Sequence, residues 1–312
     1  MSSARNCKAS AAPAWWCATG SLGGLGCTGS RRLNAPSYPA TISAIAAPGR
    51  WAGPPSTATG TAMFDAYIIC GTPRTGSTLL CKLLAATRTT GDPHSFYRRQ
   101  DVSEWAEEWN LPPRDLMREP EFQLAYLNAA IDAGKGGTEI FGLRLMRENL
   151  DELSAILDRT FPGLASDKAR FERAFGRVLY VHLSRENKLA QAVSLVKAEQ
   201  TGLWHVASDG TEIERVGSPG EPRYDFQRIR DEVAKLEAYD AAWNTWFAEQ
   251  DITPLRIGYE WLSSSPAATL ISICQALGLQ PPNAGDVKPA VAKLADATSL
   301  DWIRRYHLDA TV

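Results

Sequence analysis

The sequence predicts an α/β fold in which a doubly wound parallel sheet is flanked by helices within a single domain. Four short apolar runs, typical of strands, each precede a segment whose apolar residues recur at the three- and four-residue spacing of a helix. Strands that alternate with helices in this way indicate parallel β-α-β units. A chain of 312 residues has ample length to bury the core of one such domain.

The third apolar run is apolar almost throughout, as expected for a central strand that helices cover on both faces. The last helix is expected to end at Gly278, because glycine favours helix C-caps. The predicted strands cover residues 67–71, 139–146, 177–183 and 253–259. The predicted helices lie within residues 79–84, 101–134, 150–157, 188–203, 229–243 and 267–277.

Three segments lack these patterns. Residues 89–99 are predicted to form a surface loop or short strand, and residues 205–223 a glycine-rich excursion or lid. Residues 1–62 are rich in Ala, Ser, Gly and Pro and lack acidic residues, which predicts disorder. Met63 directly precedes the first apolar run, so we expect translation to start there and the domain to cover residues 63–312. No stretch has the continuous apolar length of a secretory signal or a transmembrane helix.

The charge and cysteine content exclude several classes of protein. Lys and Arg number 33 against 35 Asp and Glu, so the basic excess typical of a nucleic-acid-binding protein is absent. The six cysteines form neither a C-x-x-C pair nor a cluster with histidine, so no zinc or redox site is indicated. Cys70 and Cys81 lie on apolar elements and are expected to be core residues. A cytoplasmic location, where thiols stay reduced, fits this pattern best.

The first strand runs directly into a loop at residues 71–78 with the sequence Gly-Thr-Pro-Arg-Thr-Gly-Ser-Thr. A strand, a glycine loop and a helix in this order predict a P-loop-type anion site. The N–H groups at the helix N-terminus, together with the Ser77 and Thr78 hydroxyls, can bind a phosphate. A phosphorylated ligand is therefore the first hypothesis, and a β-turn without a ligand is the alternative.

The loop differs from a Walker A sequence at one decisive position. Gly71 and Gly76 have the G-x-x-x-x-G spacing, and Thr78 stands where the magnesium-binding hydroxyl would be. Ser77, however, occupies the position of the signature lysine, and Arg74 is the loop's cation. Because an ATPase or GTPase needs that lysine on the transferred phosphate, a nucleotide or sugar kinase becomes a secondary hypothesis.

Four segments, in this order, resemble the bacterial PAPS-dependent carbohydrate sulfotransferases typified by trehalose 2-sulfotransferase, whose relatives include lipopolysaccharide and Nod-factor sulfotransferases. The resemblance covers roughly residues 63–307. The segments are the loop with Pro-Arg-Thr-Gly-Ser-Thr, residues 185–204 with Ala-Gln-Ala-Val-Ser and Gln-Thr-Gly-Leu-Trp, residues 254–256 with Pro-Leu-Arg, and residues 295–306 with Ala-Asp and Trp-Ile-Arg-Arg-Tyr.

The resemblance implies transfer of a sulfuryl group from PAPS (3′-phosphoadenosine 5′-phosphosulfate) to a hydroxyl of a carbohydrate or glycolipid. Adenosine 3′,5′-bisphosphate (PAP) would leave, and no metal would be needed. The residues matching the 5′-phosphosulfate loop are Arg74, Thr75, Gly76, Ser77 and Thr78.

Two further segments of the resemblance concern the rest of the donor. Arg185 and Ser194 match the 3′-phosphate site, where a guanidinium fork and a hydroxyl suit a phosphate dianion. Without the family context, an exposed arginine and an ordinary helix serine would be the alternative. Residues 293–305 match a loop that closes over the nucleotide, or else form a terminal helix.

One position departs from the family pattern. The trehalose enzymes carry a glutamate as general base where this chain has Ser95, and a serine cannot accept a proton at neutral pH. His94 is the first candidate to replace it, because an imidazole with an ordinary pKa of about 6.5 can take a proton. Asp92 is the other candidate, and Arg74 is expected to stabilise the charge on the bridging oxygen of the leaving group.

The acceptor site is less defined by sequence. Aromatic and amide side chains suit a sugar, although an aromatic core and a polar helix end would explain the same residues. A catalytically degenerate PAP(S)-binding protein is the alternative from another functional class, and a homodimer is compatible with the sequence. The resemblance implies the acceptor residues, because their segments flank the acceptor in the related enzymes: Phe96, Tyr97, Gln200, Trp204 and His205.

Overall fold

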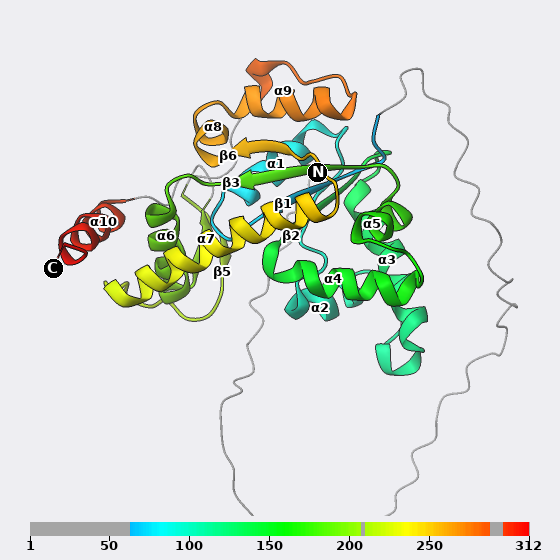
Figure 1. Ribbon diagram of the computed structural model, residues 1–312, viewed down its shortest axis with the longest axis horizontal. Helices are drawn as coiled ribbons and strands as arrows, with labels where there is room; N and C mark the ends of the chain where they lie inside the picture. The colour runs from blue at the N-terminus through cyan, green and yellow to red at the C-terminus, as the bar shows by residue number, and fades with distance from the viewer. Residues whose placement is uncertain (1–62, 207–209, 288–295, 312) are drawn as a thin grey trace, which may run out of the picture. The chain divides into compact units, whose positions relative to one another are not determined.

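In a computed structural model of the chain, the structure describes residues 63–206, 210–287 and 296–311. Its main sheet has four parallel strands in the order β2-β1-β3-β6, which confirms the predicted fold class (Figure 1). The predicted disorder of residues 1–62, and with it the predicted start at Met63, lies outside the described residues. The strands are β1 (Ala66–Gly71), β2 (Phe141–Met146), β3 (Val178–Ser184) and β6 (Leu255–Gly258).

Helices cover both faces of this sheet. Successive residues of β1 point to opposite faces, and all six are buried. Ala66, Ile68 and Cys70 belong to one core cluster, whereas Tyr67 and Ile69 belong to the other. The first cluster includes α3 (Glu119–Lys135), α4 (Arg147–Thr160), α5 (Asp167–Phe175) and α7 (Phe226–Glu249), and the second includes α1 (Ser77–Thr87), α8 (Tyr259–Ser264) and α9 (Pro266–Leu277).

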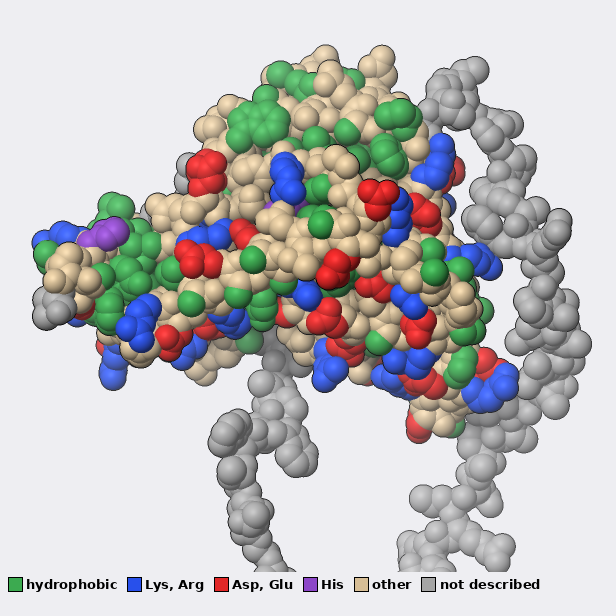
Figure 2. Space-filling view, viewed as in Figure 1, with side chains coloured by type: hydrophobic (Ala, Val, Ile, Leu, Met, Phe, Trp, Pro, Cys, Tyr) green, Lys and Arg blue, Asp and Glu red, His purple; other side chains and the backbone are tan. Residues whose placement is uncertain are grey.

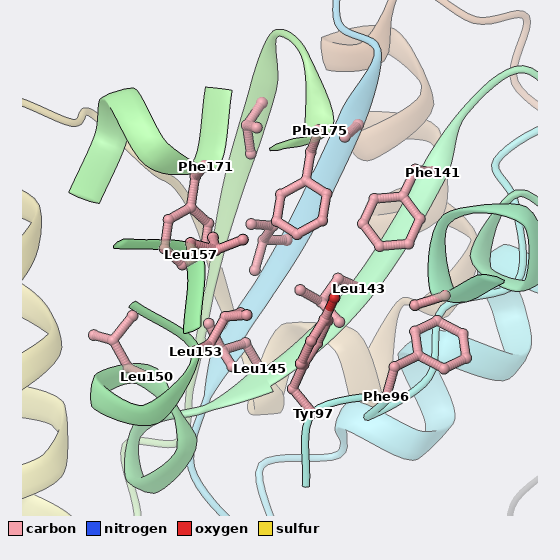
Figure 3. Packing of buried hydrophobic residues seen from close by; sticks show 14 of the residues in the cluster. Phe96, Tyr97, Phe141, Leu143, Leu145, Leu150, Leu153, Leu157, Phe171 and Phe175 are labelled. Carbon is pink, nitrogen blue, oxygen red and sulfur yellow. The ribbon is translucent and has the colours of Figure 1, made fainter. Parts of the chain in front are cut away.

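Aromatic side chains fill much of the first core. Figure 3 shows Phe175 beside Phe141 of β2, and the centroids of these two rings lie 4.9 Å apart. Phe171 and Phe175 lie four residues apart in α5, so both rings fall on the helix face that meets the sheet. The other residues of α5 are mostly charged, and the helix has nine residues. The helices predicted from the sequence do not include it.

A third, smaller core joins the C-terminal helix to the domain. Trp302 of α10 (Ala297–Asp309) is buried against Val193 and Val196 of α6 (Lys188–Thr201), and Figure 1 shows these two helices side by side. Residues 293–295 of the segment expected to cover a nucleotide lie outside the described residues. The described remainder forms α10, as the alternative of a terminal helix expected.

Two smaller features complete the described fold. The region predicted as a lid contributes the hairpin of β4 (Leu203–Val206) and β5 (Glu212–Arg215). Before β2, the short helix α2 (Val102–Glu108) carries Trp105 toward the first core. No helix within the described residues is long and apolar enough to cross a membrane. On the face drawn in Figure 2, acidic and basic side chains are intermixed, so this face carries no patch of a single sign.

The sheet register brings the functional segments to one edge. Gly71, the last residue of β1, pairs with Met146 on one side and with Leu183 on the other. Because the strands are parallel, the chain leaves β1, β2 and β3 at the same edge, where ligands bind in doubly wound folds. The loop at residues 71–78 and the segment that begins at Arg185 both start there.

Candidate active site

The loop at residues 71–78 is held by contacts on both of its sides. The buried Gln191 amide donates to the Thr72 hydroxyl over 2.9 Å and to the Pro73 carbonyl over 2.6 Å. The Thr75 hydroxyl donates to the Thr72 carbonyl at 2.8 Å, so its side chain is used within the loop. Gly76 has a φ of 80°, and a Cβ atom there would lie 2.7 Å from the Tyr259 ring. Glycine is therefore required at this position both by backbone conformation and by space.

Arg74 leaves the loop toward α6. Its Nε atom donates to the Ser194 hydroxyl over 3.0 Å, and its Nη1 atom donates to the Trp204 carbonyl over 2.7 Å. Burial, and then the nearby charge of Arg185, lower the pKa of Arg74 to about 10. The guanidinium therefore stays charged at neutral pH. The sequence predicted that both Arg74 and Ser194 belong to the site, and the structure brings them into direct contact.

Arg185 lies behind the same loop. Its Nη1 atom donates to the Arg74 carbonyl over 3.2 Å, and its guanidinium carbon lies 4.4 Å from the centroid of the Tyr259 ring. The buried Nε atom has no hydrogen-bond partner among the described atoms, and burial lowers the pKa of this guanidinium. Within the described residues neither Arg74 nor Arg185 forms an ion pair. Two neighbouring cations without carboxylate partners, one with an unused donor, fit a phosphorylated ligand.

Arg144, which the sequence reading did not single out, provides a third cation. Its Nε atom donates to the Ser95 hydroxyl over 2.7 Å, and its Nη1 atom donates to the Thr78 hydroxyl over 2.9 Å. Ser95 is buried, so the residue at the expected base position serves as a hydrogen-bond acceptor for this arginine. The one available signal was a lone charge in the apolar run Phe-Gly-Leu-Arg-Leu-Met, close to the carboxyl end of β2.

A cavity of about 430 Å³ opens beside the first turn of α1. Its walls come from α1, the segment at residues 92–94, β2 and β5. A larger surface hollow of about 640 Å³, between Arg99 and α4, contains none of the predicted site residues. The residues that line the smaller cavity are Thr78, Cys81, Lys82, Ala85, Asp92, Pro93, His94, Arg144, Ile213 and Glu214.

A model of the Stf0 sulphotransferase family matches residues 66–309, a range that includes the loop, the three arginines and every strand of the sheet. The chain belongs to the Stf0 sulphotransferase family. The family expected from the sequence motifs is therefore confirmed, and the protein is a sulfotransferase.

Two trehalose 2-sulfotransferases are similar to this sulfotransferase. The enzyme of Mycolicibacterium smegmatis is 26% identical over 264 residues, which cover 78% of this chain and 95% of the relative. The enzyme of Mycobacterium tuberculosis is 28% identical over 265 residues, with the same two shares covered. A solved sulfotransferase domain from the curacin biosynthetic pathway superposes with a TM-score of 0.43 and 17% identity, covering 72% of this chain and 77% of that chain.

The two residues considered as alternative bases of this sulfotransferase form one pair. The Nε2 atom of His94 lies 3.1 Å from the Oδ1 atom of Asp92, and both side chains are about half exposed, at 47% and 50%. The His94 carbonyl accepts a 3.0 Å hydrogen bond from the amide of Arg144, which fixes this segment beside β2. Both side chains line the cavity, although the adjacent Ser95 points to Arg144.

His205 of β4 contacts the loop through Thr78. Its Nε2 atom lies 3.0 Å from the Thr78 hydroxyl and 3.5 Å from a carboxylate oxygen of Glu214. Burial, and then the charges of Arg74 and Arg144, lower the pKa of His205 to about 3. The imidazole is therefore neutral at pH 7, and its contact with Glu214 is polar rather than an ion pair.

The expected acceptor residues divide into two groups. Trp204 and His205 lie at the site, and the guanidinium carbon of Arg74 is 6.0 Å from the Trp204 ring. Phe96 and Tyr97 are wrong as acceptor residues, because they are 1% and 5% exposed within the first core. The amide of Gln200 is already used within the chain, because it hydrogen-bonds the backbone N–H and carbonyl of Arg223.

The described residues contain no cluster of three or more His, Cys, Asp or Glu side chains that could hold a metal ion. The three cysteines among them, Cys70, Cys81 and Cys274, are buried free thiols. Burial raises the pKa of Cys81 to about 11, so this thiol at the cavity wall is protonated at neutral pH. The prediction that Cys70 and Cys81 are core residues is confirmed.

Proposed function

We propose that this sulfotransferase transfers the sulfuryl group of PAPS to a hydroxyl of a carbohydrate or glycolipid acceptor and releases PAP. The observation that carries the proposal is the meeting of Arg74, Ser194 and Arg185 behind the loop. A ligand with phosphate groups at two positions would use the loop for one and this cluster for the other. The trehalose 2-sulfotransferases, similar over most of the chain, support a carbohydrate acceptor.

In this proposal the loop binds the 5′-phosphosulfate. The backbone amides of Thr75, Gly76, Ser77 and Thr78 precede or begin α1, where N–H groups and the helix dipole favour an anion. The side chain of Thr75 is turned into the loop, so its amide is the group left for the donor. Arg185 and Ser194 would bind the 3′-phosphate, and the unused Nε donor of Arg185 suits that role.

The proposed reaction is a direct displacement at sulfur. The acceptor oxygen forms a bond to sulfur, and the bond between sulfur and the bridging oxygen breaks with its electron pair remaining on PAP. Arg74 would stabilise the negative charge that grows on that oxygen, and one such donor is often worth about two orders of magnitude in rate. A sulfuryl group carries less negative charge than a phosphoryl group, so we expect the cations of the chain to suffice without a metal.

The pair of Asp92 and His94 would take the acceptor's proton. At neutral pH a carboxylate can only accept hydrogen bonds, so the Nε2 atom of His94 carries the proton directed at Asp92. The Nδ1 atom is then the unprotonated nitrogen and can receive the proton of a hydroxyl in the cavity. Asp92 would hold the tautomer and stabilise the imidazolium, as the carboxylate does in a catalytic triad.

The acceptor would occupy the cavity of about 430 Å³. Its polar walls, which include Lys82, Asp92, His94 and Glu214, can hydrogen-bond the hydroxyl groups of a sugar. The free thiols of the described cysteines agree with a reducing compartment, so the proposal places the reaction in the cytoplasm.

A thermal-shift titration with PAP and with ATP–Mg²⁺ tests the donor. We expect PAP to stabilise the protein, by about 2.7 kcal/mol at a hundredfold excess over its dissociation constant, and ATP–Mg²⁺ to have little effect. The reverse order would favour the kinase. Incubation of ³⁵S-labelled PAPS with trehalose and with host glycolipid extract then tests turnover. PAP binding without transfer to either would favour a non-catalytic PAP(S)-binding protein.

A further inference from the structure

Arg144 differs in its partners from two other partly buried arginines, Arg98 and Arg147. Arg98 donates to a carboxylate oxygen of Asp101 at 2.9 Å, and Arg147 donates to Asp151 at 3.0 Å. The partly buried guanidinium of Arg144 instead contacts two neutral hydroxyls and forms no ion pair within the described residues. A cation that is partly withdrawn from water without a counter-charge is costly, and an anionic ligand would offset that cost.

The position of Arg144 indicates which anionic group it would bind. Through Thr78 it touches the first turn of α1, and it also lines the cavity beside that turn. Arg74 extends from the loop in another direction, toward Ser194. Arg144 therefore stands between the loop that would bind the donor and the cavity that would bind the acceptor, which is where the transferred group must lie.

We propose that Arg144 binds the sulfuryl group itself and that Ser95 is its positioning residue, an inference that rests on the proposed function. Ser95 accepts the Nε–H group at 2.7 Å and Thr78 accepts from Nη1 at 2.9 Å, which fixes the plane of the guanidinium. Among the described residues, the Nη2 atom has no hydrogen-bond partner, so its N–H groups are available to a ligand. During transfer, the acceptor oxygen bonds to sulfur and the bridging oxygen leaves with its electron pair. Arg144 stays protonated and stabilises the sulfuryl oxygens as they move between the two.

The proposal separates two ligands that differ by one group. PAPS carries the sulfuryl group and PAP lacks it, so a residue that binds this group should discriminate between them. We expect Arg144→Gln to weaken PAPS binding about tenfold or more, while PAP affinity changes less than about twofold. Ser95→Ala, which removes only the hydroxyl, should weaken PAPS binding roughly threefold and spare PAP.

Calorimetric titration of PAPS and PAP into the native protein and each variant makes this test. Arg147→Gln is the matched control, because it removes a nearby arginine that pairs with Asp151 and does not line the cavity. Arg144→Lys should give an intermediate loss of PAPS affinity. It provides a milder change if the glutamine variant does not fold. If Arg144→Gln weakened the affinities for PAPS and PAP equally, or weakened neither, the role of Arg144 would be overturned. A native protein that binds neither ligand would overturn the proposed function together with this inference.

Discussion

The Nε atom of Arg74 donates a hydrogen bond across 3.0 Å to the hydroxyl of Ser194, although 120 residues separate the two in the chain. This contact fixes the loop after β1 against α6. It also places a hydroxyl and a guanidinium where one ligand can use both. Variants of Arg74, of the Asp92–His94 pair, of Gly76 and of His205 test what this site does.

Replacement of Arg74 should affect transfer more strongly than replacement of its partner. Arg74→Ala removes the cation proposed to stabilise the leaving oxygen, so we expect the rate of ³⁵S transfer to fall by about a hundredfold or more. Ser194→Ala keeps the guanidinium and removes one hydroxyl, and we expect PAP affinity to fall by about tenfold. Equal, small effects of both variants on transfer would contradict the role given to Arg74.

The Asp92–His94 pair can be tested at the proton-transfer step. His94→Gln should lower turnover about a hundredfold or more while PAP affinity stays unchanged, because the side chain lines the cavity proposed to hold the acceptor. Asp92→Asn should lower turnover less, since it removes the group that holds the tautomer and leaves the imidazole in place. Single-turnover transfer rates separate the chemical step from binding. Near-normal turnover of His94→Gln would remove this residue from the mechanism.

Gly76 can be tested by stability, independently of any ligand. Gly76→Ala must adopt a φ of 80° and push the Tyr259 ring, which would lie 2.7 Å from the new Cβ atom. Gly137→Ala is the matched control, because its φ is 82° and no atom lies within 4 Å of a Cβ atom there. Urea unfolding should show a loss of about 1 kcal/mol for the control and a loss at least about 1 kcal/mol larger for Gly76→Ala. Equal losses would show that the ring contact is unimportant.

His205 should make folding sensitive to acid. Its pKa is lowered to about 3 in the folded protein by burial and then by Arg74, Arg144 and Lys82, so the unfolded chain takes up this proton at higher pH. The free energy of unfolding therefore falls as the pH drops from about 6.5 toward about 3, and this contribution is fully present above that window. We expect His205→Gln to reduce the fall by about 1–3 kcal/mol in urea unfolding measured at several pH values. The same change at the exposed His307 is the control, and an unchanged pH profile for His205→Gln would contradict the expectation.

The sheet and the loop could be predicted because their signals are local. Each strand is a short apolar run, and Gly71, Gly76 and the hydroxyl residues of the loop lie within one segment of eight. The family motifs also predicted that Ser194 and Arg185 belong to the site. Residue spacing alone does not reveal that Ser194 bonds to Arg74 rather than to Arg185.

Other features depend on tertiary contacts that no local pattern contains. Arg144 meets Ser95 and Thr78 from positions 49 and 66 residues away, so its role appears only when β2 stands beside β1. The family resemblance predicts that Phe96 faces the acceptor, because its segment flanks the acceptor in the related enzymes. Its ring packs instead 5.2 Å from that of Trp105, because the backbone at residue 94 pairs with β2 and directs the following side chains into the core.

The three arginines of the site come from the ends of three different strands. Arg74 follows β1, Arg144 belongs to β2 and Arg185 follows β3, so their mutual repulsion arises only when the sheet assembles. Folding thus brings together charges that a multiply anionic donor would neutralise. A cell's supply of that donor should therefore influence how long each molecule remains folded and escapes proteolysis, in addition to how fast it reacts.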